Sequence, residues 1–510
     1  MLNDVRVRAP EFAPDACWLN TGGKALALRE LRGQVVLLDF WTYGCVNCLH
    51  VLPDLGYLEK KYAGRPFVVI GVHSGKFDNE KDMANLRNAV LRHGIEHPVV
   101  CDEAYRVWRS YAVRAWPTLV LIDSEGYVAG TVSGENQRDV LDRAVAELLR
   151  RAAGQGTGGA GAPRVFLERD GQTPTPLSFP GKVLADGDGG RLFVADSGHN
   201  RCVVGPLAGG NRREDYTYIG DGEQGFVDGA FETCRFRSPQ GMALSPDGRV
   251  LYVADTENHA IRCVDLTART VTTIAGTGRQ ASGAFRAGAA RAADLNSPWD
   301  LLLAGGDGDA LYIAMAGSHQ IGLLHVSAQR VLPFAGTGRE ARADGAAHEA
   351  AFAQPSGLAT DGERLFVADA ESSCIRSVGL GAAPRVETLV GGDLFDFGNV
   401  DGAGDAARLQ HPLGVAWDAA TGTVFVADTY NHRVRHLDPV TRRIALLAGA
   451  GRTSDLYEPG GLSAAGGKLY VADTNNHRVR TVDPATGAMS DWPMGGLCAP
   501  DLCFPETNPT

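Results

Sequence analysis

The sequence predicts a multidomain protein in which an α/β domain is followed by an all-β propeller of six blades. Two observations carry this prediction: strand-like and helix-like segments alternate over the first 150 residues, and one phrase then recurs six times. A Gly- and Ala-rich stretch separates the two patterns. A chain of 510 residues is too long for one ordinary core, so more than one folding unit is expected.

Residues 1 to 150 have the pattern of a sheet covered by helices on both faces. Near-continuous apolar runs rich in β-branched residues predict strands, and the segments between them predict helices. In chain order the expected elements are the strand 35 to 41, a helix from 45 to about 61, the strand 67 to 72, a polar helix around 79 to 93, the strand 118 to 123 and a helix from about 135 to 150.

The domain boundary is expected between residues 151 and 163. This stretch reads RAAGQGTGGAGAP and holds almost nothing that a core can bury, which is typical of a flexible linker. The propeller then takes residues 164 to 495. Residues 496 to 510 form a C-terminal tail with Cys498 and Cys503. Two reduced or buried thiols, a small disulfide loop and a shuttle thiol pair for Cys45 are considered for them, and a zinc site shared with the CxxC pair is the most remote alternative.

The second half of the chain is a tandem array. A proline opens each repeat, at Pro180, Pro239, Pro298, Pro355, Pro412 and Pro459. Each unit holds three short alternating strands and a fourth such as 271 to 276 or 444 to 449, and six such sheets close into a propeller. The inserts before each new proline are expected to be loops on one rim. The phrases resemble NHL repeats, whose name-giving Asn-His is present at Asn258-His259, Asn431-His432 and Asn476-His477.

Cys45 and Cys48 are spaced for thiol-disulfide exchange. They stand at the start of a predicted helix, directly after a buried strand, in DFWTYGCVNC. A helix N-terminus stabilises a thiolate at Cys45, and one helical turn brings Cys48 within reach to resolve a mixed disulfide. A CxxC pair alone also occurs in zinc sites and in inactive positions.

Two further residues strengthen the redox interpretation. Asp39 lies on the strand six residues before Cys45, where a partly buried carboxylate takes the proton from Cys48 during resolution. Pro117, in Ala-Trp-Pro-Thr before an apolar strand, is placed for a cis-proline loop that faces the thiols. The predicted catalytic residues are therefore Cys45, Cys48, Asp39 and Pro117.

Residues Ala9 to Arg150 resemble thioredoxin-like proteins of the membrane-anchored reductase and peroxiredoxin-related type. The resemblance implies that Cys45 attacks and Cys48 resolves, with Asp39 buried and Pro117 in the cis-proline position. Val46-Asn47 replaces the Gly-Pro of general thioredoxins, which leaves the redox potential open. As a whole, the chain is similar to the family of NHL repeat-containing protein 2, through WTYGCVNCLHVLPDL and the phrase from Tyr57 to Asp82.

Two functions are considered. In the first, the protein is a thiol-disulfide oxidoreductase whose propeller recruits a protein partner or a protein-disulfide substrate. In the second, it is a propeller scaffold with a vestigial redox domain, since a fold alone does not fix a reaction. A third, metal-dependent propeller enzyme is the most remote. No cofactor and no metal are expected.

Histidines and aspartates recur in the repeats. His199, His259, His319, His432 and His477 are read as occupying one repeat position, where a blade-stabilising hydrogen bond explains them better than a metal site. A turn or cap role is expected for Asp196, Asp255, Asp369, Asp428 and Asp473. The third repeat diverges, with Trp299-Asp300 after its proline and Met315 in the aspartate position.

Composition and charge exclude other classes of function. The formal net charge of -11 does not fit nucleic-acid binding, which needs a basic face. The N-terminus has no apolar signal region and no segment has 18 consecutive apolar residues, so neither a membrane location nor export is expected and a cytoplasmic location is the default.

His50, His73 and Cys101 are candidates for additional residues near the thiols, with a solvated position expected for His50.

Overall fold

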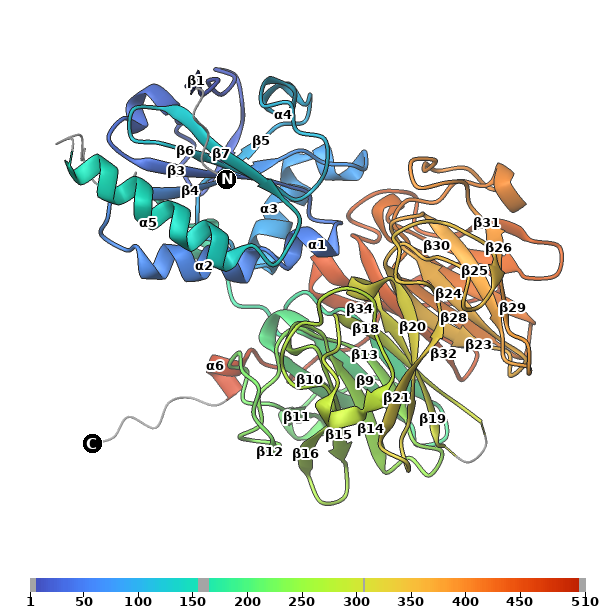
Figure 1. The fold of residues 1–510 in the computed structure, drawn as a ribbon. Helices are drawn as coiled ribbons and strands as arrows, with labels where there is room; N and C mark the ends of the chain where they lie inside the picture. The colour runs from blue at the N-terminus through green and yellow to red at the C-terminus, as the bar shows by residue number, and fades with distance from the viewer. Residues whose placement is uncertain (1–5, 155–164, 306–307, 504–510) are drawn as a thin grey trace, which may run out of the picture. The chain divides into compact units, whose positions relative to one another are not determined.

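The computed structural model describes residues 6 to 154, 165 to 305 and 308 to 503. The chain divides into two compact units, the first ending at Thr173 and the second beginning at Pro174 (Figure 1). Each unit matches the predicted fold class, an α/β domain and then a six-bladed propeller. The expected linker is helical over residues 151 to 154, and its remainder, 155 to 163, lies outside the described residues.

The first unit is built on a seven-stranded mixed sheet with the order β1-β7-β6-β3-β4-β5-β2. Strands β3, β4 and β5 run parallel, and β6 and β7 extend the sheet antiparallel from β3. The strands are β1 Val7–Arg8, β2 Trp18–Leu19, β3 Val35–Trp41, β4 Phe67–His73, β5 Val99–Cys101, β6 Thr118–Ile122 and β7 Tyr127–Ser133. The α-helices are α1 Val46–Leu49, α2 Leu52–Lys61, α3 Met83–Arg92, α4 Arg106–Ser110 and α5 Arg138–Gly154.

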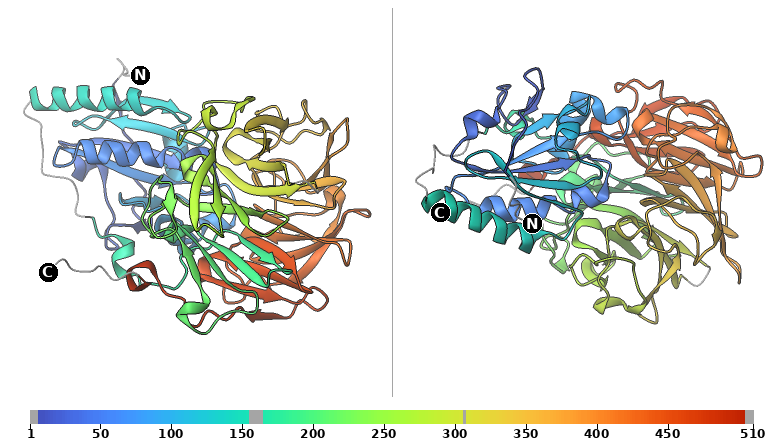
Figure 2. Two further views of the ribbon diagram at one scale, coloured as in Figure 1. Left: turned by 90° about the horizontal axis from the view of Figure 1, so that it is seen from below. Right: turned by 45° about the horizontal axis from the view of Figure 1, so that its top comes forward.

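Strand β3 is buried on both faces, as its continuous apolar run predicts. Val35 and Leu37 pack with α2 and α5, which run side by side on one face of the sheet (Figure 2). Val36, Leu38 and Phe40 pack on the other face, with residues of α4 and of the 3-10 helix Leu28–Leu31. Asp39 and Trp41 therefore point to the same face as α2.

The predicted helix from 45 to 61 is two helices. Helix α1 ends at Leu49 and α2 begins at Leu52, with Pro53 in its first turn. A proline has no N–H to donate and its ring crowds the carbonyl four residues earlier, here that of Leu49. The break isolates a short α1 that carries the cysteines. Likewise, the polar helix expected at 79 to 93 consists of the 3-10 turn Asn79–Lys81 followed by α3.

The residues just after the linker belong to the first unit, so the propeller starts later than the expected residue 164. Phe166 forms a β-bridge with Thr21, and the Glu168 amide donates to Asn20 Oδ1 at 2.9 Å. Arg87 Nε lies 2.8 Å from a Glu168 carboxylate oxygen. These contacts, together with the 3-10 helix Glu168–Gly171, fix the segment to the α/β unit.

Six antiparallel sheets, or blades, form the second unit (Figure 1). The first blade holds β8 Val183–Asp186, β9 Arg191–Asp196, β10 Arg201–Pro206 and β11 Thr217–Ile219, and the second holds β12 Gly229–Ala230, β13 Pro239–Leu244, β14 Val250–Asp255, β15 Ala260–Asp265 and β16 Thr270–Ala275. The third blade holds β17 Gly288–Ala289, β18 Pro298–Ala304, β19 Ala310–Met315, β20 Gln320–His325 and β21 Arg330–Ala335, and the fourth holds β22 Gly345–Ala346, β23 Pro355–Thr360, β24 Arg364–Asp369, β25 Cys374–Gly379 and β26 Arg385–Val390. The fifth blade holds β27 Gly402–Ala403, β28 Gly414–Asp418, β29 Thr423–Asp428, β30 Arg433–Asp438 and β31 Arg443–Ala448, and the sixth holds β32 Pro459–Ala465, β33 Lys468–Asp473, β34 Arg478–Val482 and β35 Met489–Asp491.

The inserts between repeats do more than form rim loops. Four of them contribute a two-residue Gly-Ala strand, β12, β17, β22 or β27, that pairs with the outermost long strand of the following blade.

Part of the expected C-terminal tail is ordered. Leu497 packs in the core between the first and sixth blades, Cys498 O accepts from Arg201, and helix α6 spans Pro500–Cys503.

Neighbouring blades are joined by one recurring hydrogen bond. The residue directly before β10, β15, β20, β25, β30 or β34 has φ between 49° and 55° and accepts from a backbone N–H of the next blade. The acceptors are Asn200, His259, His319, Ser373, His432 and His477. The structural role expected for the histidines is therefore confirmed for four of them. His199 is an exception, because it precedes the acceptor Asn200 and instead pairs with Asp196 at 2.9 Å.

The repeated aspartates form buried ion pairs, which corrects the turn or cap role expected for them. Each carboxylate is at ion-pair distance from an arginine on the next strand of its blade and accepts a backbone N–H from the preceding loop. None caps its 3-10 turn with its side chain. The pairs are Asp196–Arg201, Asp255–Arg262, Asp369–Arg376, Asp428–Arg435 and Asp473–Arg478.

Candidate functional site

The two cysteines of the CxxC lie where the sequence predicts them, at the end of β3 and the start of a helix. Cys45 is the N-cap residue of α1, and its carbonyl accepts the N–H groups of Cys48 at 3.0 Å and Leu49 at 3.2 Å. Both cysteines carry free thiols. Cys45 is half-buried and Cys48 is fully buried, so Cys45 is the sulfur that a substrate can reach.

The two thiols have different electrostatic environments. Burial raises the pKa of Cys48 well above its ordinary value, the neighbouring Cys45 thiol raises it further, and the charge of Asp39 adds to the effect. A hydrogen bond with the backbone of Thr42 opposes the rise only in part. Cys48 therefore stays protonated near neutral pH and needs a base before it can act as a nucleophile.

Asp39 is completely buried, and neither carboxylate oxygen has a hydrogen-bond partner. Burial raises the pKa of Asp39 to about 7, with His97 opposing the rise. A carboxyl group that titrates near neutral pH takes up and returns protons readily. Its electrostatic influence on Cys48 brings together two of the residues that the sequence singles out.

Pro117 follows a cis peptide bond with Trp116 and immediately precedes β6. In the antiparallel pair of β3 and β6, Thr118 is opposite Phe40 and Leu119 is opposite Asp39. Continuing this register sets Pro117 at the level of Trp41, at the end of β3 from which the cysteine loop departs. The four predicted residues thus belong to one end of β3 and the segments next to it.

Glu80 is a residue of this site that sequence reasoning missed. It is completely buried, and its two carboxylate oxygens accept the N–H groups of Gly44 at 2.7 Å and Phe77 at 2.9 Å. Gly44 directly precedes Cys45, so Glu80 fixes the loop that presents the nucleophile. Its place in a polar segment of the sequence carries no sign of this contact.

Two histidines near the thiols are also explained. His50 is not a solvated helix residue, because its side chain is 6% exposed and its Nδ1 lies 2.5 Å from Glu135 Oε2. His73 is buried, with its ring stacked on Tyr43 and edge-on to Trp41. Burial lowers the pKa of His73 to about 3, so it remains neutral.

The propeller cysteines Cys202, Cys234, Cys263 and Cys374 are buried or half-buried free thiols, and four further cysteines lie elsewhere. Cys17, directly before β2, is exposed, and the Cys101 N–H at the end of β5 donates to its carbonyl at 3.0 Å. Burial raises the pKa of the Cys101 thiol to about 12. Cys498 is disulfide-bonded, and the side chain of Cys503 lies outside the described residues.

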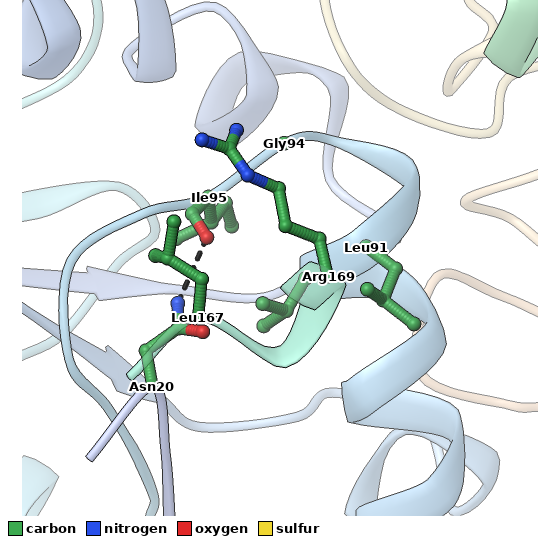
Figure 3. A pocket seen from close by; sticks show the side chains of 7 residues that line it. Asn20, Leu91, Gly94, Ile95, Leu167 and Arg169 are labelled. Atoms are coloured by element: carbon green, nitrogen blue, oxygen red, sulfur yellow. Dashed lines mark hydrogen bonds between the residues drawn. The ribbon is translucent and has the colours of Figure 1, made fainter. Parts of the chain in front are cut away.

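A small pocket of the first unit lies away from the cysteines and is too small for a substrate. Asn20, Val90, Leu91, Gly94, Ile95, Leu167 and Arg169 line it (Figure 3). Its volume is about 20 Å³, room for about one water molecule. No cysteine contributes to its lining, so we assign the site to the surface around Cys45 instead.

The described part of the propeller offers no comparable chemistry. Lys182, from the first blade, crosses the ring of innermost strands and donates to Ser356 O at 2.9 Å and to Leu413 O, in the fourth and fifth blades. Over the residues that the structure describes, no three His, Cys, Asp or Glu side chains gather closely enough to hold a metal ion. In the same described ranges, no helix is both long and apolar enough to cross a membrane.

Family models match both units. The thioredoxin-like model matches residues 33–128, and the NHL repeat model matches residues 236–264, 409–437 and 456–481. These matches cover the cysteine site and three of the six repeats.

Two relatives align with 89% of this chain, and a third aligns with 26% of it. NHL repeat-containing protein 2 of Gallus gallus is 41% identical over 492 residues, which cover 89% of this chain and 66% of the relative. Protein SUPPRESSOR OF QUENCHING 1, chloroplastic, of Arabidopsis thaliana is 43% identical over 476 residues, 89% of this chain and 44% of the relative. Thiol-disulfide oxidoreductase ResA of Bacillus anthracis is 30% identical over 130 residues, 26% of this chain and 72% of the relative. The chain thus spans two thirds or less of the length of the two-domain relatives.

Proposed function

The chain belongs to the family of NHL repeat-containing protein 2, and from this premise we propose that it is a thiol-disulfide oxidoreductase acting on a protein partner that the propeller recruits. The observation that carries the proposal is the contrast between the two cysteines, one accessible at a helix N-terminus and one buried beside a carboxyl group with a raised pKa. The similarity to a relative named as a thiol-disulfide oxidoreductase supports it.

In the direction that starts from the reduced pair, the Cys45 thiolate attacks one sulfur of a substrate disulfide. That S–S bond breaks, a bond from Cys45 Sγ to the substrate forms, and the first substrate thiolate leaves. Cys48 then gives its proton to Asp39 and attacks Cys45 Sγ, which releases the second substrate thiolate. Two electrons pass to the substrate, and an external dithiol restores the cysteines.

Pro117 is assigned a role in shaping the surface that receives the substrate. Its position at the end of β3, next to the departing cysteine loop, supports this assignment. The propeller is assigned the role of recruiting the partner through its surface loops. Lys182 and the contacts around it occupy the centre of the ring, which supports binding at a rim instead of in an axial channel.

A trapping experiment tests the oxidoreductase function. Cys48→Ser removes the resolving thiol, so mixed disulfides with partners should accumulate through Cys45 and disappear on reduction, whereas the variant with both cysteines replaced should trap nothing. If no Cys45-dependent adduct forms and the wild type reduces no generic disulfide, the catalytic proposal is wrong. Partner binding that survives loss of both thiols would then favour the scaffold.

A second experiment tests recruitment by the propeller. The exposed residues of the rim loop 276 to 297 are exchanged while the buried Phe285 is kept. Adducts with the natural partner should fall, while reduction of a small generic disulfide is unchanged. Equal loss of both activities would show that the exchange disturbs the α/β unit and not recruitment.

A further inference from the structure

We propose that His97 and Glu59 form the route by which Asp39 exchanges its proton with solvent. The inference deepens the proposed function and rests on it, because a buried base that accepts the Cys48 proton must pass it on before the next turnover. Neither residue stands near the cysteines in sequence. Both are brought to this side of the sheet by the fold.

Unpartnered polar atoms surround Gly71. Asp39 is paired with Gly71 in the parallel register of β3 and β4, and neither oxygen of its carboxylate has a hydrogen-bond partner. A Cβ placed on Gly71 would lie 3.0 Å from Trp41 Nε1 and 3.4 Å from His97 Nε2, which are also buried without partners. Buried polar groups are usually hydrogen-bonded, so three unpartnered polar side chains next to one glycine are unusual.

Glycine at position 71 is what leaves this space open. A side chain at position 71 would fill the space beside the imidazole, because the Cβ alone would already be in close contact with Trp41 Nε1 and with Val99 at 3.2 Å. The strand itself does not need glycine, which is unfavourable in strand interiors. Close approach of polar side chains over the backbone accounts for it.

The Nδ1 atom of His97 is connected to solvent through Glu59. Its Nδ1 lies 3.4 Å from Glu59 Oε1, at ion-pair distance, and Glu59 stands on α2 with 31% of its side chain exposed. The imidazole itself is buried, with 4% of its side chain exposed. An imidazole receives a proton at one nitrogen and releases one at the other, so His97 can join a buried carboxylate to a solvated one.

The backbone around His97 is fixed. Asn20 donates from its side-chain amide to Ile95 O at 2.8 Å and to His97 O at 2.9 Å, and the first of these bonds is drawn in Figure 3. The Gly71 N–H donates to Pro98 O at 2.9 Å. These three bonds hold the imidazole over Gly71 at a constant position, as a relay requires.

Other titratable groups on this side of the sheet do not offer an alternative route. Cys48 from α1 is the proton donor in the reaction, and His73 from β4 is stacked on Tyr43, lies edge-on to Trp41 and stays neutral. Leu119, opposite Asp39 on β6, is apolar, and Leu55 of α2 packs in the same cluster as Leu119. His50, at the end of α1, also has a carboxylate neighbour, Glu135, but His97 is the charged group that acts on Asp39.

The proton follows the chemistry step by step. When Cys48 attacks Cys45 Sγ, the Cys48 proton moves to the Asp39 carboxylate and the mixed disulfide bond breaks. Asp39 then gives a proton to His97 Nε2, while Nδ1 releases one to Glu59 and from there to water. The departing substrate thiolate takes a proton from solvent, so charge and atoms balance.

Ellman's reagent separates the two chemical steps in the full-length chain. Attack by Cys45 releases one thionitrobenzoate, and resolution by Cys48 releases a second. A Cys17→Ser background removes the exposed thiol. Two phases in this background are the signature of the proposed function, and a missing second phase would contradict that function whatever His97 does.

Given two phases, His97→Phe should slow the second about tenfold and leave the first unchanged, a typical effect of losing one proton-transfer group. The rate of the second phase should rise with pH as Asp39 ionises. The midpoint of this pH dependence should move to higher pH in His97→Phe, because His97 lowers the pKa of Asp39. His97→Gln keeps polarity without relaying a proton and should be equally slow. Glu59→Gln should slow the same phase, whereas the exposed neighbour Glu96→Gln should not.

The inference is overturned if His97→Phe and His97→Gln both keep the wild-type second phase and its midpoint. It is also overturned if His97→Gln restores the rate, since packing or polarity alone would then suffice. A further check combines Asp39→Asn with His97→Phe: a shared route predicts no additional slowing beyond Asp39→Asn, and additive losses would show independent effects. Near-ultraviolet circular dichroism confirms that each variant is folded.

Discussion

Lys182 Nζ and Asp300 Oδ2 lie 3.4 Å apart, joining the first and third blades across the centre of the propeller. Both residues occupy the second position after the repeat proline, which is glycine in the other four blades. A Cβ on Gly461 would lie 2.5 Å from Lys182 Cδ, and one on Gly241 would lie 2.3 Å from Asp300 Cα. The glycines therefore make room for one charged pair, and the divergence of the third repeat at Asp300 has a structural partner.

Breaking this pair should destabilise the propeller. Lys182→Met leaves the Asp300 carboxylate buried with only its two backbone N–H donors, and loss of one partner of a buried ion pair costs about 3–5 kcal/mol. Replacing both residues by glycine restores the common repeat and should cost less than Lys182→Met alone. The unfolding transition of the propeller, followed by calorimetry, distinguishes the two variants. A double variant less stable than the single one would show that lysine acts mainly through packing.

The bond between blades predicts which substitutions His259 tolerates. Its Nδ1 accepts the Ser297 N–H at 3.0 Å from a φ of 49°, and Asn200 makes the equivalent bond in the first blade. His259→Asn should be almost neutral, because asparagine supplies an acceptor and tolerates this conformation. His259→Ala should lower the free energy of unfolding by about 1–3 kcal/mol, the cost of a buried unpaired donor. Equal effects of the two substitutions in urea unfolding would contradict the assignment.

The propeller was predictable because each repeat carries its own strands and turn residues, and six copies specify the number of blades. The roles of the repeated polar residues could not be predicted in the same way. A fixed place in the repeat is compatible with a cap and with an ion pair, and only the packed blade shows Asp255 against Arg262. In the third blade Met315 and Gly322 replace both members together, and a Cβ on Gly322 would lie 3.6 Å from Met315 Cγ.

In the α/β unit, local patterns predicted the cysteine pair, the buried Asp39 and the cis bond before Pro117. The residues that surround them could not be predicted, since Glu80 and His97 reach the site through contacts between distant segments. The two-residue strands β1 and β2 are too short to leave a pattern of alternation. The helix break was not predicted either, since one helix from 45 to about 61 was expected and Pro53 separates α1 from α2.

Glu80 should control the stability of the cysteine loop. Glu80→Ala leaves the N–H groups of Gly44 and Phe77 buried without these acceptors, which costs about 1–3 kcal/mol per group. Glu80→Gln keeps one acceptor oxygen and should cost less. Amide hydrogen exchange at Gly44 measures the effect directly, with faster exchange expected in Glu80→Ala than in Glu80→Gln. Unchanged protection in both variants would show that other contacts hold the loop.

Asp39→Asn should stabilise the α/β unit above neutral pH while impairing resolution by Cys48. The pKa of Asp39 is raised to about 7 from 3.8, so the folded state binds its proton more tightly than the unfolded state, and wild-type stability falls as pH rises between these values. Three pKa units correspond to about 4 kcal/mol, an upper limit for the gain from asparagine at about pH 8. Below about pH 4 both states are protonated and this gain should disappear. Urea unfolding across this range measures it, with the exposed Asp78→Asn as control. Parallel curves for wild type and Asp39→Asn would show that the carboxyl group is not held near neutrality by burial.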